Sequence, residues 1–157
     1  MTRVGVVGAA GKMGKTLVAM IRESPDLDLA AAVDQPGQQA IGQDAGTVAN
    51  VGETGVFIAD DLAQVVADID VLIDFTIAVA TEKNMEICHS AGTRMVIGTT
   101  GLSESQIVRL DEISSSVPVV FASNYSIGVN ATFQLVEMAA GIFGDSVDVE
   151  IIESHHR

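Results

Sequence analysis

Residues 2–14 read Thr-Arg-Val-Gly-Val-Val-Gly-Ala-Ala-Gly-Lys-Met-Gly, and this stretch decides the fold that the sequence predicts. A valine-rich run passes into a glycine-bearing turn and then into a helical pattern over Lys12–Glu23. The glycines of the turn are spaced i, i+3 and i+6, whereas the usual dinucleotide fingerprint has i, i+2 and i+5. Both spacings have a similar physical effect, because residues without a Cβ let the backbone approach a pyrophosphate and the helix N-terminus offers free N–H groups.

An acidic residue stands where a fold of this kind contacts the adenine ribose. Asp34 closes a second apolar run, Leu27–Val33, and follows Gly14 by 20 residues. A carboxylate accepts hydrogen bonds from two ribose hydroxyls and repels a 2′-phosphate. A glycine turn between a strand and a helix can also be a tight turn and nothing more. Together with Asp34, the turn favours dinucleotide binding.

Strand-like and helix-like stretches alternate over the first 121 residues. The expected strands are Thr2–Val7, Leu27–Val33, Val56–Ile58, Val71–Phe75, Met95–Ile97 and Pro118–Phe121. The expected helices are Lys12–Glu23, Asp61–Ala67, Thr81–Ala91 with a stop at Gly92, and a segment from the capping box Ser103–Gln106 to Ser115. Gln35–Gly55 is expected to be a loop with a short helical turn. Strands separated by helices imply parallel pairing with right-handed crossovers, so the sequence predicts an open, Rossmann-like α/β sheet.

Two later strand ends carry small polar residues. Gly98-Thr99-Thr100-Gly101 follows one expected strand, and Ala122-Ser123-Asn124-Tyr125 follows the next. Ligands of open α/β sheets lie at the carboxyl ends of the strands. Hydroxyl and amide groups there suit a ribose and the nicotinamide carboxamide, although either segment alone has ordinary loop composition.

The alternation of strands and helices ends at Asn124–Asn130, a segment of mostly small and polar residues that we interpret as a hinge. A Met- and Ala-rich helix over Ala131–Phe143 and a strand over Val147–Glu153 are expected beyond it. One helix and one strand cannot bury a core of their own. We therefore expect a dinucleotide-binding domain over residues 1–126, and in residues 127–157 a hinge and the first part of an α+β substrate-binding and oligomerisation domain that the chain does not complete.

The composition of the chain argues against several classes of binding partner. A formal net charge of −13 and a pI near 4.3 argue against nucleic acid and against an anionic membrane surface. The single cysteine, Cys88, cannot form an internal disulfide and suits a reducing cytosol. No secretory signal is apparent, and no apolar run approaches the roughly 20 residues that a membrane span needs. We expect a soluble, cytoplasmic protein without a metal site.

The chain ends on Glu153-Ser154-His155-His156-Arg157, in an acidic protein that has no Lys or Arg from Leu110 to His156. A basic and titratable cluster after a predicted strand suits the edge of an anion site. The alternative is that these are ordinary tail residues.

Five segments in a fixed order resemble one family. They are Val7–Gly14, Val71–Thr76, Val96–Gly101, Ala122–Asn130 and Glu150–Arg157, of which the last two are specific and the glycine-rich turn is not. With them the whole chain resembles the dihydrodipicolinate reductase family of the diaminopimelate route to lysine. The resemblance implies NADH- or NADPH-dependent reduction of a cyclic, unsaturated dicarboxylate, 4-hydroxy-tetrahydrodipicolinate, to tetrahydrodipicolinate by an enzyme that is typically a homotetramer.

The resemblance also implies residue roles. For the pyrophosphate it implies Gly8, Ala9, Ala10, Gly11, Lys12 and Met13, and for the adenine ribose Asp34. Toward the nicotinamide it implies Gly98, Thr99, Thr100, Ala122, Ser123, Asn124 and Tyr125. His155 matches the proton donor of the family, and His156 matches a substrate-carboxylate ligand, with Arg157 beside it. A histidine near its ordinary pKa of about 6.5 is suited to give a proton at neutral pH.

Three departures from the family pattern shape the expectation. The family's next lysine and its Gly-Thr carboxylate clamp would follow Arg157, where this chain ends, so we expect little or no turnover from these 157 residues alone. Gln35 stands where some members carry an arginine for the 2′-phosphate of NADPH, which predicts a preference for NADH that Lys12 could soften. Ile77-Ala78 stand where family members often have an Arg or Pro, so a polar adenine contact is not expected there.

Two other functions remain open on the sequence. One is an NAD(H)-binding module without catalysis of its own. The other is a further small nicotinamide-dependent dehydrogenase of amino-acid metabolism, such as the homoserine or aspartate-semialdehyde type, in which a Glu-x-His-His ending is not expected.

Overall fold

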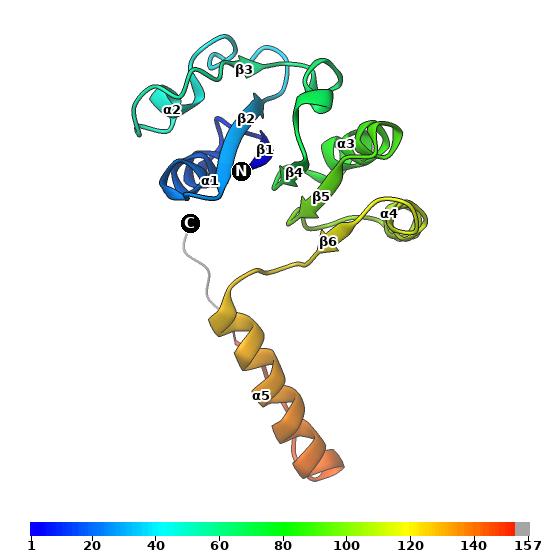
Figure 1. Cartoon of the computed structure of the whole chain (residues 1–157). Coiled ribbons are helices and arrows are strands. Elements are labelled where there is room, and N and C mark those ends of the chain that lie inside the picture. The colour runs from blue at the N-terminus through cyan, green and yellow to red at the C-terminus, as the bar shows by residue number, and fades with distance from the viewer. Residues whose placement is uncertain (153–157) are drawn as a thin grey trace. The chain divides into compact units, whose positions relative to one another are not determined.

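One sheet of parallel strands organises the computed structural model, which describes residues 1–152 (Figure 1). Its strands are β1 (Thr2–Val7), β2 (Leu27–Val33), β3 (Ile58–Ala59), β4 (Val71–Asp74), β5 (Arg94–Ile97) and β6 (Val119–Phe121). They lie in the order β3-β2-β1-β4-β5-β6. This is the doubly wound arrangement of a Rossmann-like fold, so the predicted α/β class is confirmed.

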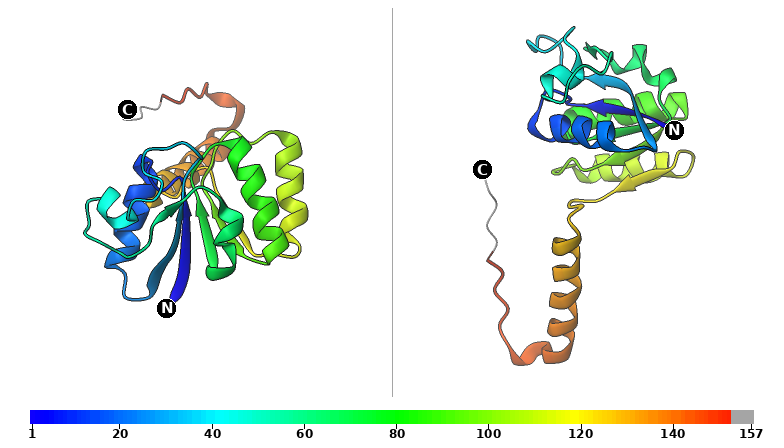
Figure 2. Two further views of the ribbon diagram at one scale, coloured as in Figure 1. Left: turned by 90° about the horizontal axis from the view of Figure 1, so that it is seen from above. Right: turned by 60° about the vertical axis from the view of Figure 1, so that its left-hand side comes forward.

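Helices cover both faces of the sheet (Figure 2). The helices of this part of the chain are α1 (Lys12–Glu23), α2 (Ala45–Val48), α3 (Ala78–Ala91) and α4 (Glu104–Ser114). Val18 and Ile21 of α1 pack with Val4 and Val6 in one buried cluster. A second cluster, on the other face, holds Met85 of α3, Leu110 and Ile113 of α4, and Val7, Leu72 and Ile97 of the strands. Because residues of β1 enter both clusters, the strand is buried on both sides.

Several boundaries agree with the sequence and others do not. β1, α1 and β2 begin and end where predicted, and the capping box of Ser103 and Gln106 starts α4. The helix expected over Asp61–Ala67 is wrong: the structure has two 3-10 turns, η1 (Leu62–Gln64) and η2 (Val66–Asp68). Leu62 and Val66 both enter the core, and short 3-10 pieces are usual in connectors of this length.

α3 begins at Ala78, three residues before the predicted start. Its N-cap residue is Ile77, whose side chain offers no capping acceptor, so the usual start signal is missing. The stop was predictable, since Gly92 has φ +71° and its N–H donates to the carbonyls of Cys88 and His89.

The described part of the chain divides into two units, Met1–Ser123 and a second one that begins at Asn124. The second contains α5 (Ile127–Phe143) and the 3-10 turn η3 (Gly144–Ser146). α5 begins four residues before its predicted start, because Ser126 caps it by accepting from the Val129 N–H. The strand expected over Val147–Glu153 is not formed in residues 147–152, since a strand needs a partner and the described part of this unit has none.

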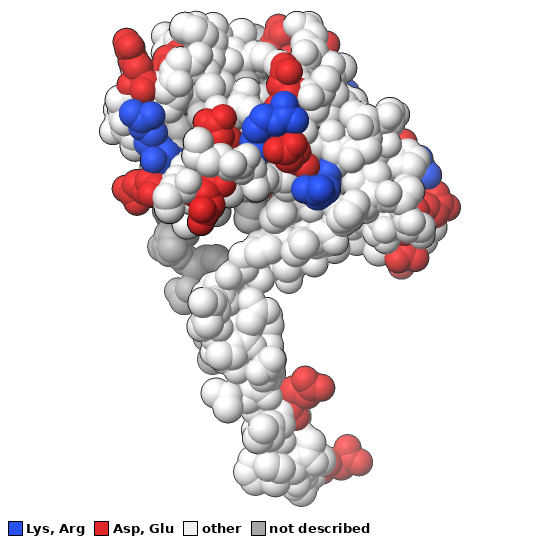
Figure 3. Space-filling view, in the orientation of Figure 1, with Lys and Arg blue, Asp and Glu red and all other residues white. Residues whose placement is uncertain are grey.

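The surface of α5 is apolar and exposed, with Ile127, Leu135 and Ile142 between 65% and 89% accessible. Hardly any charge lies along it (Figure 3). Among the described residues, Ile127–Ser146 is the one helical stretch that length and composition alone would allow to cross a membrane, with a mean hydropathy of 1.2. This corrects the prediction that no apolar run approaches such a length. The core helix of a soluble protein passes the same test of length and composition, so this one helix is weak evidence for a membrane span.

Candidate functional site

The direction in which the chain adds strands to the sheet reverses between the neighbouring strands β1 and β4. From β1 the chain winds outward through β2 and β3, and from β4 it winds the other way through β5 and β6. Ligands of open α/β sheets bind outside this switch point. Gly8 follows β1 and Thr76 follows β4 at the same place: a Cβ on Gly8 would lie 3.0 Å from the Thr76 Cγ2. The two loops therefore meet where a ligand is expected.

The glycine turn is shaped to bring backbone close to a ligand. Gly8 has φ +70°, and a Cβ on Gly14 would lie 2.1 Å from the Gly8 carbonyl oxygen and 2.6 Å from the Ala9 Cα. The helix can pack this tightly on the turn only because position 14 has no side chain. Gly11 is the N-cap of α1, so no side-chain oxygen accepts from the first helical N–H groups. These groups and the positive end of the helix dipole suit a pyrophosphate.

Asp34 links the glycine turn to the end of β2. Its Oδ2 accepts from the Ala10 N–H at 2.8 Å and its Oδ1 accepts from the Gln35 N–H at 2.8 Å. Each carboxylate oxygen has a second lone pair, which is suited to accept from a ribose hydroxyl. The structure thus brings two predicted parts of the site together, although the contact between Asp34 and the turn was not foreseen.

Gly98 follows β5 and lies against an aromatic ring. A Cβ at this position would lie 2.0–2.5 Å from three ring carbons of Phe75, and the Gly98 N–H donates to the Asp74 carbonyl at 2.8 Å. Thr99, which follows, is only 2% exposed, whereas Thr100 is exposed. The Thr99 hydroxyl is hydrogen-bonded inside the protein, so its contact with a cofactor would have to come from its backbone.

Sequence reasoning missed a buried carboxylate at the end of β4. Asp74 is 1% exposed, and Oδ1 accepts from the Thr76 N–H at 2.9 Å, the Thr76 hydroxyl at 2.6 Å and the Thr99 hydroxyl at 3.2 Å. Oδ2 accepts from the Asn84 Nδ2 at 2.8 Å. The signal was available, since an acid in the apolar run of Val71–Phe75 must find donors when it is buried.

The buried thiol of Cys88 is not a nucleophile of this site. Burial, and to a smaller extent the Asp74 carboxylate, raise the pKa of Cys88 to about 12. The thiol therefore stays protonated at neutral pH, and unreactive thiols of this kind fill a core.

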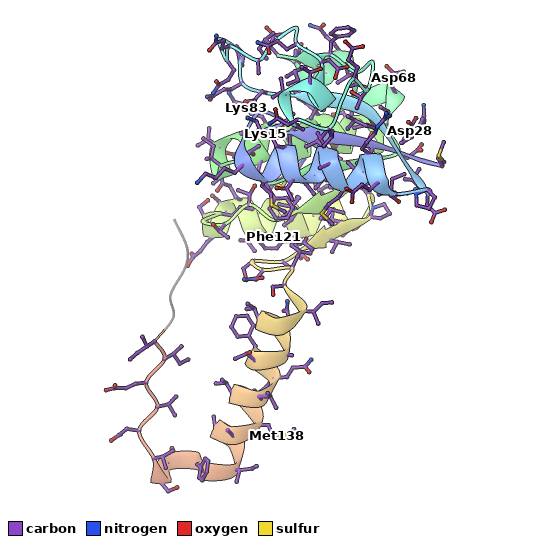
Figure 4. The ribbon with its side chains drawn as sticks, turned by 90° about the vertical axis from the view of Figure 1, so that its left-hand side faces the viewer. Lys15, Asp28, Asp68, Lys83, Phe121 and Met138 are labelled. Carbon is purple, nitrogen blue, oxygen red and sulfur yellow. The ribbon has the colours of Figure 1, made fainter. Side chains whose placement is uncertain are left out.

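The lysines of the chain lie near the same edge. The three lysines of the chain are Lys12 and Lys15 in the first turns of α1 and Lys83 in the second turn of α3. Lys15 and Lys83 lie toward the edge where these helices begin, while Asp28 and Asp68 lie toward the opposite one (Figure 4). Arg3 and Arg94 stand at the starts of β1 and β5, and Arg22 lies in the last turn of α1, so cations are present at both edges and only the lysines gather at the carboxyl one.

The remaining predicted site residues fall in three groups. The Ala122 N–H donates to the Ile97 carbonyl at 3.2 Å, which holds this residue beside the end of β5, and Ser123 is the last residue of the first unit. Asn124 and Tyr125 belong to the second unit. His155, His156 and Arg157 lie outside the described residues.

A family model and the curated relatives both indicate one family. A family model described as "Dihydrodipicolinate reductase, N-terminus" matches residues 2–125. The chain is 51% identical over 156 residues to the 4-hydroxy-tetrahydrodipicolinate reductase of Alkalilimnicola ehrlichii, covering 99% of this chain and 58% of the relative. It is also 51% identical to the enzyme of the same name from Acinetobacter baylyi, covering 99% and 56%. The chain thus spans little more than half the length of these curated relatives.

Solved structures show the same fold at lower identity. A dipicolinate-bound dihydrodipicolinate reductase from Paenisporosarcina sp. TG-14 matches with a TM-score of 0.73 and 23% identity, over 89% of this chain and 54% of that one. An aspartate-semialdehyde dehydrogenase with NADP from Candida albicans matches with a TM-score of 0.52 and 15% identity, over 64% and 30%. At these identities the likeness concerns the fold alone.

Proposed function

The chain belongs to the dihydrodipicolinate reductase family, and from this premise we propose that it forms the dinucleotide-binding part of an enzyme that reduces 4-hydroxy-tetrahydrodipicolinate to tetrahydrodipicolinate in lysine and diaminopimelate biosynthesis. The observation that carries the proposal is the turn between β1 and α1. There Gly14 allows the helix to pack against Gly8, and Asp34 accepts from the Ala10 N–H just before the uncapped start of α1.

The residues of the carboxyl edge fit a nicotinamide dinucleotide. The turn Gly8–Met13 holds the pyrophosphate, with Lys12 offsetting its charge, and Asp34 accepts from the adenine ribose. The second nucleoside then lies over the ends of β4, β5 and β6, because β2 and β4 flank β1 on opposite sides. There Gly98–Thr100 and Ala122–Tyr125 receive the nicotinamide. When bound, the reduced nicotinamide supplies the hydride.

Residues beyond the first unit complete the reaction in this proposal. His155 gives the proton, and His156 with Arg157 binds the substrate carboxylates, since a dicarboxylate needs cations to offset its charge. The dipicolinate-bound reductase of similar fold supports a cyclic dicarboxylate as the substrate class. We assign residues 1–126 to the dinucleotide domain and residues 127–157 to the hinge and the substrate domain, and we propose a cytoplasmic homotetramer.

A turnover assay tests the reaction. NADH absorbance is followed with the cyclic substrate generated in situ, for the 157-residue chain and for the same chain completed with the remaining residues of the Alkalilimnicola relative. We expect turnover by the completed chain and little or none by the 157 residues, because the reactive part of the substrate site is shared with the added residues. A completed chain that binds NADH but leaves the substrate unreduced contradicts the assigned reaction. Robust turnover by the 157 residues contradicts the need for the added part.

A dinucleotide-binding module without catalysis is the second candidate for the 157 residues. It is favoured by the first unit, which carries its own two buried clusters and the turn, Asp34 and Gly98–Thr100. NADH binding without turnover in the 157-residue chain is the outcome that both candidates share, and the completed chain separates them.

Asp34 and Gln35 set the expected cofactor preference. The carboxylate repels a 2′-phosphate, and the neutral Gln35 offers it no counter-charge. We expect the chain to bind NADH more tightly than NADPH. Gln35→Arg should tighten NADPH binding by about tenfold, as a charge-assisted pair with a phosphate does, and change NADH binding little. Calorimetric titration with both cofactors measures the ratio, with Gln38→Arg in the same loop as the control. Tighter NADPH binding by the unsubstituted chain contradicts the preference.

A further inference from the structure

Asp74 lies at the centre of a closed hydrogen-bond network that joins three elements. The carboxylate at the end of β4 accepts from Thr76, from Thr99 after β5 and from Asn84 on α3. Thr99 Oγ1 in turn accepts from the Thr81 hydroxyl at 2.8 Å and from the Thr76 N–H at 2.9 Å. Among the described residues, no buried side-chain oxygen or nitrogen lacks a partner. The network is therefore complete without a ligand.

Every hydrogen bond at position 74 is donated to the carboxylate. The hydroxyls of Thr76 and Thr99 each have one proton, and both are given to Oδ1. The Asn84 amide gives a proton to Oδ2. An ionised carboxylate only accepts, which satisfies every donor, whereas a protonated one would face a donor with a donor. The buried charge is stabilised by four donated bonds and holds the donors in fixed positions.

The groups held in this way surround the expected place of the nicotinamide. Thr76 contacts the glycine turn, since its Cγ2 is the atom that limits position 8. The Phe75 ring lies against Gly98. In the sequence, Phe75 stands between Asp74 and Thr76, which are hydrogen-bonded to each other. Thr100, which is exposed, follows the anchored Thr99. The adenine ribose belongs to the β2 side, so these β4 and β5 loops serve the other end of the dinucleotide.

We propose that Asp74, together with Thr81, Asn84 and Thr99, is a positioning network for the nicotinamide end of the cofactor: it fixes the Phe75–Thr76 and Thr99–Thr100 loops in the orientation that receives the ring. The proposal rests on the proposed dinucleotide function. None of these four side chains touches the cofactor. Their effect passes through the backbone of the two loops.

Binding of two ligands distinguishes a positioning role at the nicotinamide end from a general effect on the stability of the fold. NADH and ADP-ribose share the adenosine, the pyrophosphate and the second ribose, but ADP-ribose lacks the nicotinamide. The measured quantity is the ratio of the dissociation constant of ADP-ribose to that of NADH, from calorimetry on the 157-residue chain. A variant that only loosens the fold weakens both ligands and leaves the ratio unchanged.

Thr99→Val keeps the shape of the side chain and removes the hydroxyl that joins Thr81 to Asp74. We expect the ratio to fall about tenfold, which corresponds to one broken buried hydrogen-bond pair. Thr93→Val is the matched control. Thr93 is also buried, at the other end of β5, and its hydroxyl reaches only the Val66 carbonyl at 3.5 Å. The control should leave the ratio within about twofold of the unsubstituted chain.

Exchanging the carboxylate and the amide between positions 74 and 84 tests whether the network restores cofactor binding. Asn84→Asp places two carboxylates face to face and should lower the ratio by about tenfold or more. Adding Asp74→Asn restores one donor and one acceptor at that contact, while the oxygen of the new amide still accepts from Thr76 and Thr99. The double variant should recover the ratio to within about threefold of the unsubstituted chain.

Thermal unfolding of each variant verifies that it is folded at the temperature of the titration. The results then test the positioning role, the hydrogen-bond assignment and the proposed function separately. Equal weakening of both ligands by Thr99→Val and Asn84→Asp overturns the positioning role and leaves dinucleotide binding intact. A double variant no better than Asn84→Asp overturns the hydrogen-bond assignment on which the role rests. Binding of neither ligand by the unsubstituted chain overturns the proposed function and this proposal with it.

Discussion

Gly14→Ala is expected to lower the free energy of unfolding by about 3 kcal/mol or more and to weaken NADH binding by at least about 100-fold. The added methyl would lie 2.1 Å from the Gly8 carbonyl oxygen and 2.6 Å from the Ala9 Cα. Both atoms belong to the backbone, so no side-chain rotation relieves the overlap. Either α1 moves away from the sheet or the turn opens, and each movement disturbs the N–H groups that would contact a pyrophosphate.

Two other glycines calibrate this prediction. A Cβ on Gly11 would meet only the Gly8 carbonyl oxygen, at 3.1 Å, so Gly11→Ala should have a smaller effect. Gly141 in α5 has no atom within 4 Å of an added Cβ, and alanine there should raise helix stability by up to about 1 kcal/mol. Thermal unfolding and calorimetry with NADH give both quantities. Unchanged stability and NADH affinity in Gly14→Ala would mean that the turn is not packed as described.

Gly98→Ala is expected to displace the Phe75 ring and to cost about 1–3 kcal/mol of stability, as overpacking of a core does. The added methyl would lie 2.0–2.5 Å from three carbons of the ring. A ring can move where backbone cannot, so this cost is smaller than that at position 14. The moved ring would then occupy the carboxyl edge of β4 and β5, and NADH should bind about tenfold more weakly.

A double-mutant cycle assigns the effect to this contact. Phe75→Ala removes the ring and costs stability on its own account through lost packing. If ring overlap is the cause, Gly98→Ala in the Phe75→Ala background should cost at most a few tenths of a kcal/mol. Additive costs in the double variant would show that Gly98 is needed for another reason, such as the hydrogen bond from its N–H to the Asp74 carbonyl.

Local patterns were enough to predict the first half of the fold. The valines of Thr2–Val7 enter both core clusters, and the glycine turn lies where the strand ends. Asp34 follows β2 at the same edge, as its sequence position suggested, although its hydrogen bond with the Ala10 N–H did not follow from the sequence. These features depend on neighbours in sequence, or on the rule that parallel strands end at one edge, so they do not require long-range information.

Features that depend on distant partners were not predictable in the same way. The network of Asp74 did not follow from the sequence, because its donors come from three places in the chain, and Thr81 and Asn84 lie within an expected helix. Residues 147–152 have the composition of a strand but form none, since pairing is a property of two segments. Ile77 gives no capping signal, and the start of α3 was therefore placed too late.

The central claim is that the carboxyl edge of this sheet is a dinucleotide site, and calorimetric titration of the unsubstituted 157-residue chain with NADH tests it most directly. We expect one NADH to bind per chain, with ADP-ribose binding more weakly because it lacks the nicotinamide. The absence of binding by NADH and by ADP-ribose, from a chain whose cooperative thermal unfolding shows that it is folded, would contradict the claim.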